Sequence, residues 1–146
     1  GMRRFPWWSA MAVLALSVPL RAQEPPATAI EVVVPGLTQN DGRVACALHA
    51  DAASFPQGAG VAHDAVTPAD GQGLCRFTGV PPGRYAVAVM HDANGNGRLD
   101  TNALGMPTER WGISVVEAPR LRAPRFEEAA FDLGAEPLRL RITLVP

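Results

Sequence analysis

Lysine is absent from this chain of 146 residues, and all thirteen of its basic residues are arginines. Fourteen acidic residues bring the formal net charge to −1. Positive charge is therefore not in excess, and the basic patch that nucleic-acid binding needs is not expected. Only two cysteines occur, which are too few for a structural zinc site. These absences exclude a nucleic-acid partner and a zinc-stabilised fold.

No apolar run is long enough to act as a membrane span. The longest, residues 7–20, is shorter than the roughly 18 to 20 residues that cross a bilayer. It follows Met2-Arg3-Arg4 and ends before Arg21-Ala22, which is typical of a secretory signal peptide over residues 1–22 that is cleaved after Ala22. An uncleaved anchor is the alternative. Cleavage predicts a periplasmic or secreted protein with ten arginines against fourteen acids, a net charge of −4.

The rest of the chain predicts short strands separated by Gly and Pro turns. Residues 23–27 are expected to be a disordered leader, and residues 28–146 a single domain. Apolar and β-branched residues alternate in several short segments, one helical turn follows Pro124, and residues 51–73 form one long irregular loop with a short strand inside it. The expected strands cover residues 28–34, 43–49, about 60–66, 74–78, 84–90, 130–133 and, as a half-buried antiparallel strand, 137–145. This pattern predicts an all-β fold, a two-layer antiparallel β-sandwich.

The two cysteines lie in two of the predicted strands. Cys46 and Cys75 each occupy an alternating apolar segment, so both are expected to be buried. Because an exported chain meets an oxidising compartment, an even number of cysteines favours a disulfide between them. Two buried thiols are the alternative.

Oxygen-bearing side chains alternate with glycines directly after the strand predicted for residues 84–90. In a 12-residue calcium loop the ligands occupy positions 1, 3, 5, 7, 9 and 12, with glycine at 6. With Asp92 as position 1, the first nine positions fit through Asp92, Asn94, Asn96, the carbonyl of Arg98, and Asp100. Position 12 is Ala103 instead of glutamate, so the last ligand has to come from Thr101, Asn102 or, as the best acidic candidate, Glu109.

Calcium fits this loop better than magnesium, which keeps its waters. Two carboxylates within the loop predict a weak or moderate site of the extracellular kind. The alternative is that the Asp and Asn side chains only form Asx-turns.

The chain resembles a family of uncharacterised exported bacterial proteins known as a domain of unknown function. The residues that carry the resemblance are Phe77–Val89, His91–Asn102, Gly105–Ser114 and Pro124–Phe131. The resemblance implies an immunoglobulin-like or transthyretin-like β-domain. The chain differs from the usual family pattern at Trp111 and Ile113, where Tyr and Phe are common, and at Ala103-Leu104, where the pair is more aromatic.

The expected function is that of a non-catalytic module that binds calcium and has a binding or structural accessory role toward an unknown protein or glycan. One alternative is a metal-dependent hydrolase that uses His91 and Asp92, with His49 and His63 as further metal ligands or Ser114 with Asp92 or Asp64 as triad members. No nucleophile elbow is present, and adjacent side chains on a strand point to opposite faces. A second alternative is a glycan-binding module with Tyr85 and Trp111 as an aromatic platform, although both residues also suit the core.

Overall fold

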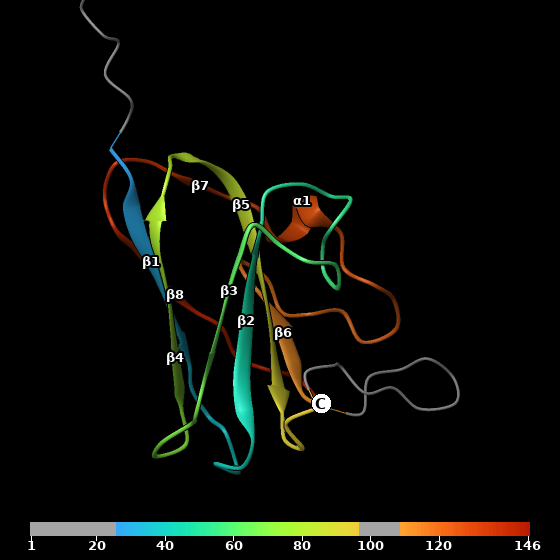
Figure 1. The fold of residues 1–146 in the computed structure, drawn as a ribbon. Coiled ribbons are helices and arrows are strands. Elements are labelled where there is room, and N and C mark those ends of the chain that lie inside the picture. Colours follow the sequence, from blue (N-terminus) through green and yellow to red (C-terminus); the bar gives the residue numbers. More distant parts are fainter. Residues whose placement is uncertain (1–25, 97–108) are drawn as a thin grey trace, which may run out of the picture.

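The computed structural model describes residues 26–96 and 109–146, and this part of the chain forms two β-sheets and one short helix (Figure 1). The elements are β1 (Thr28–Val34), β2 (Arg43–His49), β3 (Ala62–Val66), β4 (Gly73–Val80), β5 (Gly83–Asp92), β6 (Trp111–Ile113), α1 (Phe126–Ala129), β7 (Phe131–Leu133) and β8 (Leu138–Arg141). The prediction of an all-β fold is confirmed. The predicted signal peptide lies outside the described residues, and no helix within them is long and apolar enough to cross a membrane.

The three-stranded sheet has β1 at its centre, between β4 and β8. β1 pairs antiparallel with β4 and parallel with β8, where Ile30 is opposite Leu138 and Val33 is opposite Arg141. The prediction of an antiparallel strand over residues 137–145 is therefore wrong in direction and in length. Alternation of apolar residues fixes which side chains are buried, but it is identical in both strand directions and cannot decide between them.

Beyond β8 the chain passes from one sheet to the other. Ile142 N still donates to Val33 O at 2.9 Å, on the three-stranded sheet. Three residues later Val145 and Trp111 exchange two backbone hydrogen bonds of 2.7 and 3.0 Å, on the five-stranded sheet. The end of the chain thus joins the two sheets through the backbone.

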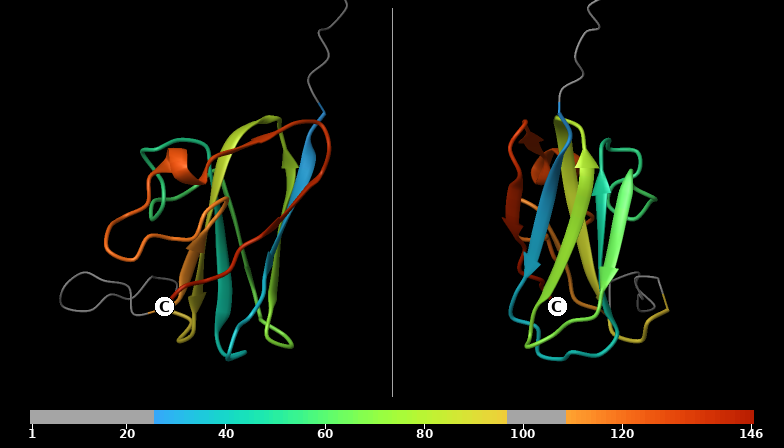
Figure 2. Two further views of the ribbon diagram at one scale, coloured as in Figure 1. Left: turned by 180° about the vertical axis from the view of Figure 1, so that it is seen from behind. Right: turned by 60° about the vertical axis from the view of Figure 1, so that its left-hand side comes forward.

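The five-stranded sheet has the order β3-β2-β5-β6, and β7 pairs with the beginning of β5. All of these pairings are antiparallel. β5 is the longest of the described strands. In its pairing with β2, Ala86 is opposite His49 at one end and Asp92 is opposite Arg43 at the other. The two sheets form two layers that face each other (Figure 2).

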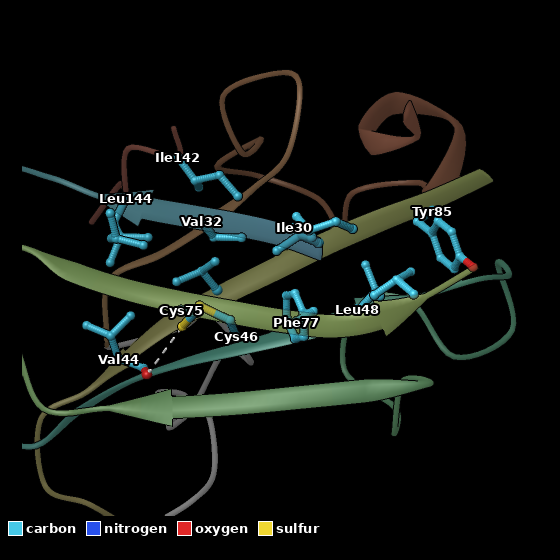
Figure 3. Close-up of a cluster of buried hydrophobic side chains, with 14 of the residues drawn as sticks. Ile30, Val32, Val44, Cys46, Leu48, Cys75, Phe77, Tyr85, Ile142 and Leu144 are labelled. Carbon is cyan, nitrogen blue, oxygen red and sulfur yellow. Dashed lines mark hydrogen bonds between the residues drawn. A yellow bond between two sulfur atoms is a disulfide. The ribbon is translucent and has the colours of Figure 1, made fainter. Parts of the chain in front are cut away.

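The main core lies between the layers, and one disulfide crosses it. Val44, Cys46 and Leu48 alternate along β2 and point into this core, where they meet the buried residues of β1, β4 and β5 (Figure 3). Cys46 and Cys75 form the predicted disulfide, which links β2 of one sheet to β4 of the other. Both cysteines are at most 2 % exposed. The expectation of two buried strand positions that face each other is confirmed.

A second apolar cluster covers the outer face of the five-stranded sheet. Alanines occupy this face of β5, where Ala86 is fully buried and Ala88 packs at the margin. Their small side chains leave room for the larger Phe55, Trp111 and Phe126, which come from the loop after β2, from β6 and from α1. Both faces of this sheet are therefore partly covered.

Ser114 connects β6, β5 and α1 at the edge of this cluster. Its side chain is fully buried, and its Oγ accepts from Val87 N at 2.9 Å and donates to Ala129 O at 2.6 Å. The Ser114 carbonyl instead accepts from Val116 N at 2.8 Å across Val115, whose φ is +74°. The hydroxyl thus replaces the backbone acceptor that this tight turn removes from the ladder.

Ser114→Ala is expected to lower the free energy of unfolding by about 1 to 3 kcal/mol, because it leaves the buried Val87 N–H and Ala129 C=O without their partner. Urea denaturation followed by circular dichroism measures this loss. Thr67→Ala is a suitable comparison, since Thr67 is exposed and lies outside the strands. A loss of less than about 0.5 kcal/mol, the range of ordinary surface substitutions, would contradict the role given to Ser114.

Candidate functional site

The loop predicted to bind calcium begins inside the sheet, because β5 extends through Asp92. Asp92 is only 3 % exposed. Its Oδ1 and the Oδ1 of Asn94 both accept from the same donor, Asn96 N, at 3.1 Å each. Gly95 N donates to Asp92 O at 3.2 Å and tightens the turn. A carboxylate oxygen and an amide oxygen therefore lie close together at the start of the loop.

Glu109 returns to this point from the other end of the loop. Met90 is opposite Trp111 in the β5–β6 pairing, and His91 N donates to Arg110 O at 2.9 Å. Continued by one more pair, this register sets Glu109 opposite Asp92. Glu109 Oε2 accepts from Ala93 N at 3.1 Å, beside Asp92. The chain thus doubles back and brings Glu109 beside Asp92. This return is needed if Glu109 is to replace the glutamate that position 12 of the loop lacks.

The turn between β1 and β2 packs against the end of β5 at His91 and Asp92. His91 is 5 % exposed, and its Nε2–H donates to Asp41 O at 2.7 Å. Gly42 has a φ of +69°, and a Cβ on it would overlap the Asp92 carbonyl oxygen and approach Ala93 to 2.7 Å. Direct packing of backbone on backbone therefore fixes the position of Asp92.

Arg110 fixes the position of Glu109. Its guanidinium donates to Gly36 O at 3.1 Å and to Leu144 O at 3.0 Å, so it links the turn after β1 to the end of the chain. The neighbouring Trp111 is held by Val145. Glu109 is thus attached to a well-anchored backbone segment.

The structure brings Asp92, Asn94, Asn96 and Glu109 into one region. The other two predicted ligands, Arg98 and Asp100, lie outside the described residues, as do Thr101, Asn102 and Ala103. Within residues 26–96 and 109–146, no group of three or more His, Cys, Asp or Glu is arranged to hold a metal ion.

The residues of the hydrolase alternative have other partners. His91 binds the Asp41 carbonyl, and Ser114 binds Val87 and Ala129. His49 lies at the opposite end of the sheet from His91, since it is opposite Ala86 in the β2–β5 pairing. His63 is exposed on β3. The structure does not bring these side chains together into a catalytic arrangement.

Tyr85 and Trp111 do not form an exposed aromatic platform. Tyr85 is 7 % exposed in the core between the sheets, where its hydroxyl donates to Pro81 O at 2.7 Å, and Trp111 is 8 % exposed in the outer cluster. They lie in separate clusters because they come from opposite faces of the sheet. Packing, the other role considered for them, accounts for both residues.

Two contacts near Asp92 were not predicted from the sequence: the packing of Gly42 against the Asp92 carbonyl, and the hydrogen bond from Arg110 to Gly36 O. At the other end of β2, the contact between His49 and Ser54 was not predicted either. The Asn-Asp-Gly sequence at residues 40–42 signals a turn, but it does not reveal what the turn packs against. An isolated arginine or histidine gives no sequence signal of its partners. These contacts depend on tertiary structure.

The fold and the loop define a small β-rich domain with acidic and amide oxygens gathered where β5 ends. The chain belongs to the family described as an uncharacterized protein conserved in bacteria (DUF2141), whose model matches residues 32–140. This range begins in β1 and ends in β8. No curated protein and no solved structure matches the chain.

Proposed function

We propose that this protein is an exported, non-catalytic module whose loop binds calcium and thereby becomes rigid enough to serve a binding or structural accessory role. The proposed ligands are Asp92, Asn94, Asn96, the carbonyl of Arg98, Asp100 and Glu109. We further propose that the two sheets form an immunoglobulin-like or transthyretin-like sandwich. The Cys46–Cys75 disulfide supports export to the periplasm or beyond, because such bonds persist in oxidising compartments.

The observation that carries the proposal is the return of Glu109 to the end of β5, where its Oε2 accepts from Ala93 N, beside Asp92. Two carboxylates that approach each other repel. A divalent cation between them would turn this repulsion into attraction, and carboxylate, amide and carbonyl oxygens are the ligands that calcium prefers. Glu109 would supply the acid that position 12 of the loop lacks.

Calcium is expected to stabilise the protein measurably. For a site with a Kd of about 10⁻⁴ to 10⁻³ M, typical of extracellular modules, 10 mM calcium adds about 1.4 to 2.7 kcal/mol by mass action. For a domain of this size this corresponds to a rise in Tm of roughly 5 to 10 °C. Differential scanning calorimetry of the purified protein, with and without calcium, measures the shift. Magnesium at the same concentration should give a smaller one.

Asp92→Asn and Glu109→Gln should each reduce the calcium-dependent rise in Tm to under about 2 °C, the size expected when the Kd rises to about 10⁻² M or above, roughly ten- to a hundredfold weaker than in the wild type. Glu136→Gln is the matched control, because it removes one negative charge from an exposed position far from the loop in sequence. An unchanged Tm of the wild type in 10 mM calcium would refute the calcium site. An equal shift in the wild type and both loop variants would show that calcium acts elsewhere.

A further inference from the structure

Residues 50–60, between β2 and β3, form a compact surface loop, which we name the strap. Its two ends are held together because Val61 N donates to Leu48 O at 2.7 Å. Inside it, Ser54 N donates to Asp51 Oδ1 at 3.0 Å, and Gly58 N donates to Ser54 O at 2.7 Å. The strap lies beside α1 in Figure 1 and in the left view of Figure 2, and its Phe55 belongs to the cluster on the outer face of the five-stranded sheet.

His49 attaches the strap to the sheet. It is the last residue of β2 and is fully buried, with its Nδ1 2.9 Å from Ser54 Oγ. Its ring packs edge-to-face against Phe55, with 5.4 Å between ring centroids. Phe55 in turn packs edge-to-face against Phe126 of α1 at 6.1 Å. One imidazole therefore joins the strap, the sheet and the outer apolar cluster.

The surroundings of His49 suit only its neutral form. Its Nε2 is buried and has no hydrogen-bond partner in the structure. Burial lowers the pKa of His49, and the nearby Asp51 carboxylate and the Pro56 backbone oppose this only in part. A second proton would place a charge inside an apolar cluster, which is costly.

The other charged groups around His49 do not offer it a partner. β3 contributes His63, which would add a like charge when protonated, and β5 contributes Arg84, which pairs with Asp132 of β7 at 3.6 Å. The acids of α1 are Glu127 and Glu128, and Glu128 pairs with Arg122 at 2.6 Å. Asp51 is the one acid that acts electrostatically on His49.

We propose that the strap is an acid-sensitive element, released from the outer face of the five-stranded sheet when His49 takes up a proton. In the closed state His49 stays neutral, and in the open state its ring reaches water and binds the proton readily. Release also removes Phe55 from its contacts with His49 and Phe126, so the outer cluster becomes accessible. The inference is independent of the calcium proposal, since His49 lies at the other end of β5 from Asp92.

The direction of the pH dependence follows from proton linkage. A histidine whose pKa is lower in the closed state favours closure above its ordinary pKa of about 6.5, and this preference is lost as pH falls below it. The ratio of open to closed strap is expected to rise about tenfold per pH unit below pH 6.5, until the pKa of the closed state is reached.

Hydrogen exchange of the purified full chain tests this inference. The amides of Ser54 and Gly58, both hydrogen-bonded inside the strap, are followed by NMR or mass spectrometry from pH 7.5 to 4.5. After correction for intrinsic exchange rates, their protection factors should fall at least twofold between pH 6.5 and 5. The amides of Val87 and Val89, in the middle of β5, should keep their protection over the same range.

Two variants make the test specific. His49→Gln keeps a group that can hydrogen-bond Ser54 Oγ but cannot ionise, so strap protection should no longer depend on pH. His63→Gln removes an exposed histidine of the neighbouring strand and should behave like the wild type. If His49→Gln fails to fold, NMR titration of the His49 ring in the wild type replaces it, and its midpoint should lie below the ordinary histidine pKa of about 6.5 and coincide with the loss of strap protection.

Three outcomes would overturn the inference. The first is a change of less than twofold in the protection of Ser54 and Gly58 across the whole range. The second is the same pH dependence in His49→Gln as in the wild type. The third is a parallel loss of protection in Val87 and Val89, which would mean that acid unfolds the domain as a whole and releases no separate strap.

Discussion

Joint replacement of Cys46 and Cys75 by alanine is expected to lower the free energy of unfolding by about 3 to 4 kcal/mol. The two residues are 29 positions apart in the sequence. By the chain-entropy relation, opening a loop of this length gives the unfolded chain that much additional freedom. The loss is a large part of the roughly 5 to 15 kcal/mol by which whole domains are stable. Urea denaturation at pH 7 measures it.

Reduction of the wild type provides the control for this prediction. Reduced wild-type protein keeps both sulfur atoms in the core and loses only the covalent link, so it separates cross-linking from packing. It should lose nearly as much stability as the double alanine variant. If the reduced protein unfolds at the same urea concentration as the oxidised one, the link between the two sheets contributes little, and noncovalent packing of the core holds them together.

Gly42→Ala is expected to destabilise the protein by about 2 to 5 kcal/mol. Part of the loss arises because alanine at positive φ costs about 1 to 2 kcal/mol. The rest arises because the new Cβ would overlap the Asp92 carbonyl and crowd Ala93, and forcing extra atoms into a packed site costs about 1 to 3 kcal/mol. Since the overlap displaces the first proposed calcium ligand, the variant should also lose the calcium-dependent rise in Tm.

Gly79→Ala is the matched control for this substitution. Gly79 has a φ of +67°, nearly that of Gly42, but a Cβ on it would meet nothing within 4 Å. It should therefore show the conformational cost alone, about 1 to 2 kcal/mol, and keep its response to calcium. Equal losses in the two variants would show that the turn between β1 and β2 does not support Asp92 as described. Denaturant unfolding and calcium titration of both variants provide the comparison.

Local patterns in the sequence predicted much of the strand structure. β1 and β2 have the predicted bounds, because β-branched runs and strict alternation bounded by turn residues leave little choice. The disulfide followed from cysteine number and position. The direction of β8 could not be predicted, because it depends on how the chain crosses from β7, in the five-stranded sheet, to β8, which lies beside β1 in the other sheet.

The outer cluster was missed for a different reason. Its β5 positions include Ala86 and Ala88, which give a weak apolar signal, and two of its large members, Phe55 and Phe126, lie outside the strands. At the loop, composition identified the oxygen-bearing side chains, whereas the approach of Glu109 to Asp92 depends on strand register. That register becomes visible only when β5 and β6 are paired. Contacts of this kind are properties of the fold and not of any local segment.

The route of the last residues has a consequence for how the molecule assembles. β1 is the central strand of its sheet, yet its parallel partner is β8, so Ile30 pairs with Leu138, 108 residues further along the chain. Pairing over such a separation makes folding slow, since the entropy of closing the chain is lost before the contacts form. A chain emerging from the ribosome therefore cannot complete this sheet until β8 has emerged.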